Sequence, residues 1–270
     1  DAYVSLTERL KGTDYYDPAH VQRGLEAIVA LDQTLAAQNI PLCVLLAPRT
    51  IDVTIGDFAY PADLTDRLDT AIQSTLGSAK VNSVELLETF RDLHDAGEYV
   101  YFRTDHHWNE KGAYLGYEAL ADKVLHKQPN SFTYETVSTD FCGTMYSQSG
   151  AFWNSSDSIC RIIPETPVET TVNYDGQYTE NSIYSEKRLN EKDKYMYYTD
   201  GNHAYISIQT DADTNRKAVL IKDSYSHIMI PYLITEYSEI TMIDLRYYHS
   251  PVSQLIEDKE NTDLCFIYSL

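Results

Sequence analysis

Short, continuous apolar runs constrain the fold of this chain more than any other feature. Each run holds only a few residues and is bounded by polar or turn-forming residues, so it is too short for a buried helix. Runs of this kind are typical of strands buried on both faces of a parallel sheet. Runs of this kind lie at 42–47, 218–221 and 264–268, and 84–87 and 240–245, which include polar residues, are two further predicted strands.

Segments with apolar residues at helical spacing alternate with these runs. An extended piece, 99–102, is predicted to lead into a polar stretch, after which Asn109 caps a helix that reaches Leu125. Strands that alternate with helices predict an α/β fold, with a mostly parallel sheet flanked by helices. The other predicted helices lie at 21–38, 61–76, 88–96, 226–237, which Pro231 interrupts, and 251–258.

The segment 127–210 differs in composition from the rest of the chain. It is rich in Pro, Ser, Thr, Asn and Tyr, and its apolar alternation is short and broken. We interpret it as a β-rich insertion within a single domain spanning 1–270. We prefer an insertion to a linker because the segment retains large apolar side chains to bury, namely Phe141, Phe152, Trp153, Ile159, Ile162 and Ile163.

The charge balance excludes some classes of partner. The chain has 21 basic and 41 acidic residues, for a net charge of −20. Nucleic acids and anionic lipids require basic surface, so neither is expected as a partner. The chain begins at Asp1 without a signal-like segment, and it has no apolar run of about 18 residues that could span a membrane. We therefore expect a soluble piece, from which an upstream signal or anchor could have been removed.

The cysteines leave the redox compartment open. Cys43 and Cys265 lie inside apolar runs and are expected to be buried free thiols. Cys142 and Cys160 flank a polar region and could pair. Four cysteines in a chain of this length do not form a disulfide scaffold.

Ser224 is the first candidate for chemistry, because it follows a predicted strand directly and enters a helix. In open parallel sheets, ligands bind beyond the carboxyl ends of the strands. The alternative is that Asp223 or Ser224 only caps the helix. Asp105 and His107 are two residues apart, so on an extended segment they would share a side, with His106 facing away. In this pair, Asp105 could orient His107 as the base for the serine. Alternatively, the two side chains could bond backbone groups or form half of a metal site.

Two motifs carry a resemblance to a known family. Residues 104–108 read Thr-Asp-His-His-Trp, and 222–226 read Lys-Asp-Ser-Tyr-Ser; 143–147 and 243–248 strengthen the match. Over roughly 40–270 the chain resembles the DHHW-type proteins, relatives of the alginate O-acetyltransferases in the SGNH hydrolase superfamily. The resemblance implies a three-layer α/β/α, flavodoxin-like fold with a circularly permuted motif order. It also implies a Ser-His-Asp triad of Ser224, His107 and Asp105.

The resemblance also implies an activity and its partners. The serine would take an acetyl group, supplied by a membrane-bound O-acyltransferase without any cofactor, and pass it to a polysaccharide hydroxyl. The protein would work at the cell surface or outside the cell, anchored through a segment that this sequence lacks. Three alternatives remain: a carbohydrate acetylesterase, a polysaccharide-binding protein without activity, and a metal-dependent hydrolase built on Asp105, His106 and His107. No metal is expected.

The remaining site candidates are less specific. The Ser224 N–H is one expected donor to an oxyanion. Arg246 could complete that site or grip substrate, or form only a surface salt bridge. Tyr225 and Tyr101 are further candidates beside the triad, and Trp108 could stack on a sugar or fill the core. The 23 Tyr against 7 Phe suit either a carbohydrate surface or cross-strand pairing.

Overall fold

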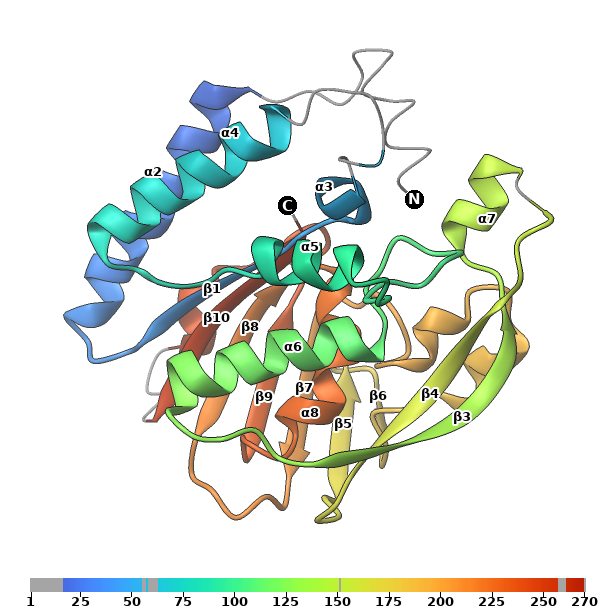
Figure 1. The fold of residues 1–270 in the computed structure, drawn as a ribbon. Helices are drawn as coiled ribbons and strands as arrows, with labels where there is room; N and C mark the ends of the chain where they lie inside the picture. Colours follow the sequence, from blue (N-terminus) through green and yellow to red (C-terminus); the bar gives the residue numbers. More distant parts are fainter. Residues whose placement is uncertain (1–16, 55–56, 58–62, 151, 257–260, 270) are drawn as a thin grey trace.

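A mixed sheet forms the centre of the molecule (Figure 1). The computed structural model describes residues 17–54, 57, 63–150, 152–256 and 261–269. Within them, eight strands pair in the order β2-β1-β10-β8-β9-β7-β5-β6. In sequence order the strands are β1 (Leu42–Ala47), β2 (Asn82–Val84), β5 (Thr170–Tyr174), β6 (Tyr178–Glu180), β7 (Tyr205–Thr210), β8 (Lys217–Lys222), β9 (Glu239–Ile243) and β10 (Thr262–Ser269).

Five of these strands, from β2 to β9 in the sheet order, run parallel to one another. Helices cover both faces of the sheet. Val44 of β1 packs in one core with the helices α2 and η2, whereas its neighbour Leu45 packs in the other core with α5, α6 and α8. Successive side chains of a strand point to opposite faces, so one strand serves both cores. The predicted α/β fold with a mostly parallel sheet between helical layers is confirmed.

The helices agree with the sequence patterns, with local differences at their ends. Asn109 caps α6, because its side chain accepts hydrogen bonds from the N–H groups of Lys111 and Gly112. The predicted helix positions 61–62 and 257–258 lie outside the described residues. The helices are α2 (Pro18–Ala36), α3 (Thr50–Thr54), α4 (Asp63–Ile72), η2 (Gln73–Gly77), α5 (Leu87–Asp95), α6 (Glu110–Leu120), η3 (Ala121–Leu125), α7 (Thr144–Ser149), η4 (Glu186–Asn190), η5 (Lys194–Tyr197), η6 (Ser224–Met229), α8 (Ile230–Leu233) and α9 (Ser253–Ile256).

Some predicted elements differ from the structure. The strand expected at 84–87 is displaced to β2, and Leu87 already opens α5. The segment 99–102 forms only an isolated bridge between Tyr101 and Trp108, because the chain turns back on itself there instead of joining a sheet.

The segment 127–210 is rich in β-structure, but it is not set apart from the sheet. Strands β3 (Phe132–Phe141) and β4 (Asp157–Pro164) pair as a separate antiparallel ribbon. Strands β5, β6 and β7 instead extend the central sheet as an antiparallel edge. Three of the apolar residues expected to be buried here, Phe152, Trp153 and Ile163, are exposed. Phe152 and Trp153 lie on the surface beyond α7, and Ile163 occupies an exposed position of β4.

Two further expectations concern disulfide pairing and membrane-spanning helices. Cys43 and Cys265 are buried free thiols at paired positions of β1 and β10, as predicted. Cys142 and Cys160 are also free thiols, so they do not form the pair that the sequence allowed. Among the described residues, no helix is both long enough and apolar enough to cross a membrane.

Candidate active site

Ser224 lies at the carboxyl end of β8, where the strand gives way to η6. Asp223 fixes this turn: its Oδ1 accepts the Tyr225 N–H at 2.9 Å, and its Oδ2 accepts the backbone N–H of Ser269 at 2.8 Å and the Ser269 hydroxyl at 2.9 Å. Asp223 is therefore the helix cap and also ties the turn to the end of β10. Because Asp223 does the capping, the Ser224 hydroxyl is left for other partners.

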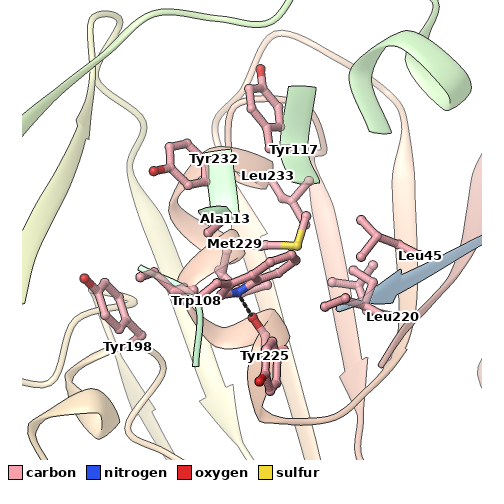
Figure 2. Close-up of a cluster of buried hydrophobic side chains, with 14 of the residues drawn as sticks. Leu45, Trp108, Ala113, Tyr117, Tyr198, Leu220, Tyr225, Met229, Tyr232 and Leu233 are labelled. Carbon is pink, nitrogen blue, oxygen red and sulfur yellow. Dashed lines mark hydrogen bonds between the residues drawn. The ribbon is translucent and has the colours of Figure 1, made fainter. Parts of the chain in front are cut away.

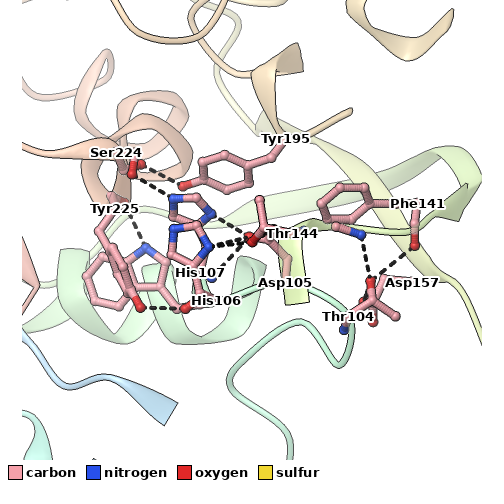
Figure 3. A network of polar contacts seen from close by, with 12 residues as sticks. Thr104, Asp105, His106, His107, Phe141, Thr144, Asp157, Tyr195, Ser224 and Tyr225 are labelled. Carbon is pink, nitrogen blue, oxygen red and sulfur yellow. Dashed lines mark hydrogen bonds and ion pairs between the residues drawn. The ribbon is translucent and has the colours of Figure 1, made fainter. Parts of the chain in front are cut away.

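The structure brings Ser224, His107 and Asp105 together across 117 residues of sequence (Figure 3). Ser224 Oγ lies 2.7 Å from His107 Nε2, and His107 Nδ1 lies 2.5 Å from Asp105 Oδ1. Because the carboxylate can only accept, His107 carries its proton on Nδ1. Its Nε2 is then free to accept the hydroxyl proton of Ser224.

Asp105 is held by both of its oxygens. Oδ1 also accepts the backbone N–H of His107 at 3.1 Å. Oδ2 accepts the N–H of Thr144 at 2.9 Å and its hydroxyl at 3.0 Å. Burial alone would raise the pKa of Asp105, but the neighbouring histidines and these hydrogen bonds outweigh burial and hold that pKa well below its usual range. The carboxylate stays ionised at neutral pH and keeps one orientation.

The local geometry of the motif differs from the extended segment expected. Asp105 accepts the N–H two residues ahead, which makes a compact Asx turn. The prediction that the two histidines point in opposite directions is wrong, because in this turn their rings lie 3.9 Å apart and inclined by 37°. Asp105 and His107 do meet, but through the turn and not through strand alternation.

His106 lies at the edge of this arrangement, with its side chain 36% exposed. Its Nδ1 lies 2.8 Å from the hydroxyl of Thr144, which gives its own proton to Asp105. Burial and the adjacent His107 lower the pKa of His106 to about 4, so it is neutral at pH 7.

The motif also resembles part of a metal site. The possible ligand atoms of Asp105, His106 and His107 all lie within 4.8 Å of one another. Both nitrogens of His107 are already engaged, one with Asp105 and the other with Ser224. A metal ion at this place would have to displace those hydrogen bonds.

Tyr195 is a site residue that the sequence did not single out. Its ring stacks on His107 with centroids 3.8 Å apart and planes inclined by 6°, and its hydroxyl donates to the Ser224 carbonyl at 2.9 Å (Figure 3). One buried side chain thus supports both the imidazole and the serine. The only signal in the sequence was a cluster of tyrosines around it.

Three predicted substrate residues lie in the interior instead. Trp108 is fully buried and donates its indole N–H to the Tyr225 carbonyl at 2.8 Å (Figure 2). Tyr101 is also buried and donates its hydroxyl to the Pro48 carbonyl at 2.6 Å. The buried Tyr225 donates its hydroxyl to the His106 carbonyl. Core packing occupies these rings, so they hold the motif in place and do not form a sugar-binding surface.

Arg246 forms an ion pair with Asp244 through two nitrogens, at 2.9 and 2.6 Å, and its side chain remains 48% exposed. Asp244 is fully buried and also lies 3.4 Å from the Lys222 ammonium. The pair is thus more than the surface salt bridge considered from the sequence, because one partner is inside the protein.

A buried polar network lies beneath the serine turn. Lys222 Nζ lies 3.1 Å from His227 Nε2, and His227 Nδ1 contacts the Thr199 hydroxyl. Burial lowers the pKa of Lys222 to about 8 despite the opposing charge of Asp244. The network joins β8, η6, β9 and the loop after Tyr198, and so fixes the elements around Ser224.

Gly143 provides a test of how tightly Asp105 is held. A Cβ at this position would collide with Cβ and Oδ2 of Asp105, and would lie 2.7 Å from its Cγ. We expect Gly143→Ala to lower any turnover that depends on Asp105 at least tenfold, and to reduce the free energy of unfolding by about 1–3 kcal/mol. Kinetics with a small acetyl ester and chemical denaturation measure the two effects.

Gly24 supplies the control for that substitution. It lies in α2, and a Cβ there would meet nothing within 4 Å. Gly24→Ala should therefore leave turnover unchanged and stabilise the protein by up to about 1 kcal/mol. Unchanged turnover in Gly143→Ala would contradict the role given to the close packing at Asp105.

A family model matches residues 7–190, well over half of the chain, and is described as an SGNH hydrolase-like domain, acetyltransferase AlgX. The chain belongs to this AlgX family. The matched segment includes Asp105 and His107 and ends before Ser224, so the serine is placed by the structure. No functionally curated protein matches this AlgX-family chain by sequence.

Several solved structures have a fold similar to that of this AlgX-family chain. Bacillus cereus PatB1 shares 22% identity at a TM-score of 0.75, covering 94% of this chain and 90% of its own; it has also been solved with a sulfonyl adduct. A DHHW family protein from Eubacterium siraeum shares 22% identity at 0.66, covering 85% and 78%. The O-acetyltransferase domain of Pseudomonas putida AlgJ shares 15% at 0.56, covering 94% and 85%. At these identities the likeness establishes the fold.

Proposed function

We propose that this protein is an extracytoplasmic O-acetyltransferase that moves an acetyl group onto a polysaccharide hydroxyl through an acetyl-Ser224 intermediate. The observation that carries the proposal is the unbroken chain of contacts from Asp105 through His107 to Ser224. Its order and distances suit a nucleophile, a general base and the carboxylate that orients the base. Membership in an acetyltransferase family supports the choice of acetyl as the transferred group.

The first half of the reaction forms the acetyl-enzyme. Ser224 gives its proton to His107 Nε2, and Oγ attacks the carbonyl carbon of an acetyl ester. The Ser224 N–H, at the start of η6, donates to the developing oxyanion. His107 then returns the proton to the leaving alkoxide as its bond to the acetyl carbon breaks.

The second half transfers the acetyl group. A sugar hydroxyl gives its proton to His107 and attacks the acetyl carbon. The bond between that carbon and Ser224 Oγ then breaks, and His107 returns the proton to Oγ. Asp105 stabilises the imidazolium formed in both halves and keeps the ring in its productive tautomer. Tyr195, stacked on the imidazole, limits the ring to one orientation.

The cellular setting is part of the proposal. We propose that a membrane-bound O-acyltransferase supplies the acetyl group, that no cofactor is needed, and that the protein acts outside the cytoplasmic membrane. Arg246, half-exposed beside the end of β9, is proposed to contact the ester or the acceptor.

The proposed function is tested by following both the enzyme and the product. Phenylmethylsulfonyl fluoride should modify Ser224, as located by peptide mass spectrometry. With 4-nitrophenyl acetate as donor, a neutral oligosaccharide should gain acetyl groups faster than acetate is released to water. Acetate release with no acetylated sugar would indicate an acetylesterase instead, and failure of both the labelling and the turnover would exclude a serine enzyme.

A further inference from the structure

A pocket of about 500 Å³ lies next to the candidate active site. One wall is α7 with the loop after it, and the other is the segment 190–194. Both walls lie beside residues that contact the triad. Thr144, at the start of α7, donates its N–H to Asp105, and Tyr195, which follows Lys194, stacks on His107. The lining residues that bear on its chemistry are Asp140, Tyr146, Phe152, Asn190, Lys192 and Lys194.

Phe152, which lines this pocket, and the adjacent Trp153 are left uncovered. Among the described residues, Trp153 and Phe152 are the most exposed large hydrophobic side chains, at 84% and 65%. Tyr146 packs edge-to-face against Phe152, with ring centroids 5.2 Å apart. Exposed aromatic rings that gather at a pocket rim indicate a contact surface more often than chance placement.

The segment that carries these rings is fixed to the site. The Tyr146 N–H donates to the Thr104 carbonyl at 3.0 Å, next to Asp105 in sequence. The Ser147 hydroxyl donates to the Gly143 carbonyl at 3.2 Å, and the Phe152 N–H donates to the Gly150 carbonyl at 2.9 Å. The backbone at Phe152 is therefore bonded to the end of α7, and α7 is bonded to the active-site turn.

The charges around the pocket are largely paired. Lys194 donates to the Leu189 carbonyl at 2.5 Å and lies 3.5 Å from Asp140. Glu191 pairs with Arg188 at 2.8 Å. This leaves the amide of Asn190 and the ammonium of Lys192 as polar groups of the lining that bond no described side chain. A ligand here meets flat apolar rings, a few hydrogen-bonding groups and the ammonium of Lys192.

This combination fits a pyranose ring. A sugar presents an apolar face of C–H bonds, which stacks on an aromatic ring, and hydroxyls at its edge, which need hydrogen-bond partners. The net charge of −20 repels a polyuronate acceptor. It also disfavours an anionic membrane surface as the occupant.

We propose that this pocket, lined by Phe152 and extended by the adjacent Trp153, binds an uncharged or amino-sugar ring of the acceptor chain, close to the sugar that receives the acetyl group. The inference rests on the proposed function for the identity of the acceptor. It assigns the acceptor to the loop after α7, and it gives Trp153 the sugar-stacking role that the buried Trp108 cannot have.

Intrinsic fluorescence measures this binding without catalysis. The chain has two tryptophans, and Trp108 is buried, so a sugar stacking on Trp153 should change the emission of Trp153 alone. Titration of the Ser224→Ala variant with cellohexaose and chitohexaose should change the emission at least for one of them, and hexagalacturonate should bind more weakly. Trp153→Ala should abolish the change, and Phe152→Ala should raise Kd roughly tenfold.

The matched control is Tyr134→Ala, which removes a ring that is 48% exposed toward the other end of β3. It should leave Kd and the hydrolysis of 4-nitrophenyl acetate unchanged. In otherwise wild-type protein, Phe152→Ala should raise the acceptor KM. Equal Kd in Phe152→Ala and the control, tighter binding of hexagalacturonate, or emission that responds only to phosphatidylcholine vesicles would overturn the proposal. Because binding is read in Ser224→Ala, these outcomes are separate from failure of the proposed chemistry.

Discussion

Replacing Ser224 with alanine is expected to lower the turnover of 4-nitrophenyl acetate by about 10⁴–10⁶-fold. The substitution removes the Oγ that lies 2.7 Å from His107 Nε2, and no acetyl-enzyme can then form. Ser224 is only partly buried, and its side chain is not the cap of η6, so the fold should persist. The measurements are steady-state kinetics, mass spectrometry of the intact protein after the donor is added, and thermal unfolding.

Ser226 provides the matched control in the same short helix. Its hydroxyl donates to the Asp223 carbonyl at 2.9 Å, and it is fully buried away from His107. Ser226→Ala should cost about 1 kcal/mol of stability and leave turnover within a few-fold of the wild type. If Ser224→Ala retained wild-type turnover while Ser226→Ala lost it, the assignment of the nucleophile would be wrong.

The second large effect is expected for Asp105→Asn, which should lower turnover by about 10³–10⁴-fold. The carboxylate accepts from His107 on one oxygen and from Thr144 on the other. An amide can accept on one side only. If its oxygen faces Thr144, its NH₂ faces His107 Nδ1, which must give up its proton and leave Nε2 protonated. His107 can then no longer accept the Ser224 proton.

The same substitution also changes stability and its pH dependence. If the amide turns the other way, the buried donors of Thr144 lose their acceptor, at a cost of about 1–3 kcal/mol. Because the folded protein holds the pKa of Asp105 below its unfolded value, the carboxylate contributes stability that is fully present above about pH 4 and is lost as the pH falls further. Denaturation between pH 7 and pH 3 should show a smaller acid destabilisation in Asp105→Asn than in the wild type.

Two controls make the Asp105 prediction specific. Asp140→Asn alters an exposed carboxylate outside the triad and should leave the turnover of 4-nitrophenyl acetate unchanged. Asp105→Asn protein should still be modified slowly by phenylmethylsulfonyl fluoride, since Ser224 is intact. Wild-type rates in Asp105→Asn would mean that Asp105 only supports the turn.

Local sequence patterns were enough to predict the scaffold. The continuous apolar runs at 42–47 and 218–221 indicated doubly buried strands, because burial on both faces leaves no polar alternation. Asn109 indicated the start of α6, because its side chain can satisfy the free N–H groups of a helix. Ser224, directly after a strand, was expected at the carboxyl edge of the sheet, and it lies there. These features depend on backbone preferences and burial within a few residues.

Other features depended on packing between distant segments. Thr144 reaches Asp105 across 39 residues, and Tyr195 donates to the Ser224 carbonyl across 29. No periodicity in the sequence encodes such contacts, because they depend on how loops from separate elements pack. The same limit explains the two tryptophans: Trp108 is buried under α6 and η6, although the sequence left its place open, and Trp153 is on the surface, although the sequence favoured burying it.

The motif at 104–108 shows what the local sequence determines and what only the tertiary structure determines. The sequence determined which side chains could do chemistry: a carboxylate and an imidazole in this motif, and a serine at the end of a distant strand. Only the tertiary structure decided how they meet, through an Asx turn at Asp105 and a hydrogen bond from Ser224 that joins residues 117 positions apart. The physical reason is that residue types and spacing determine local preference, whereas the strand order β10-β8-β9 and the helix over it determine which chain ends converge.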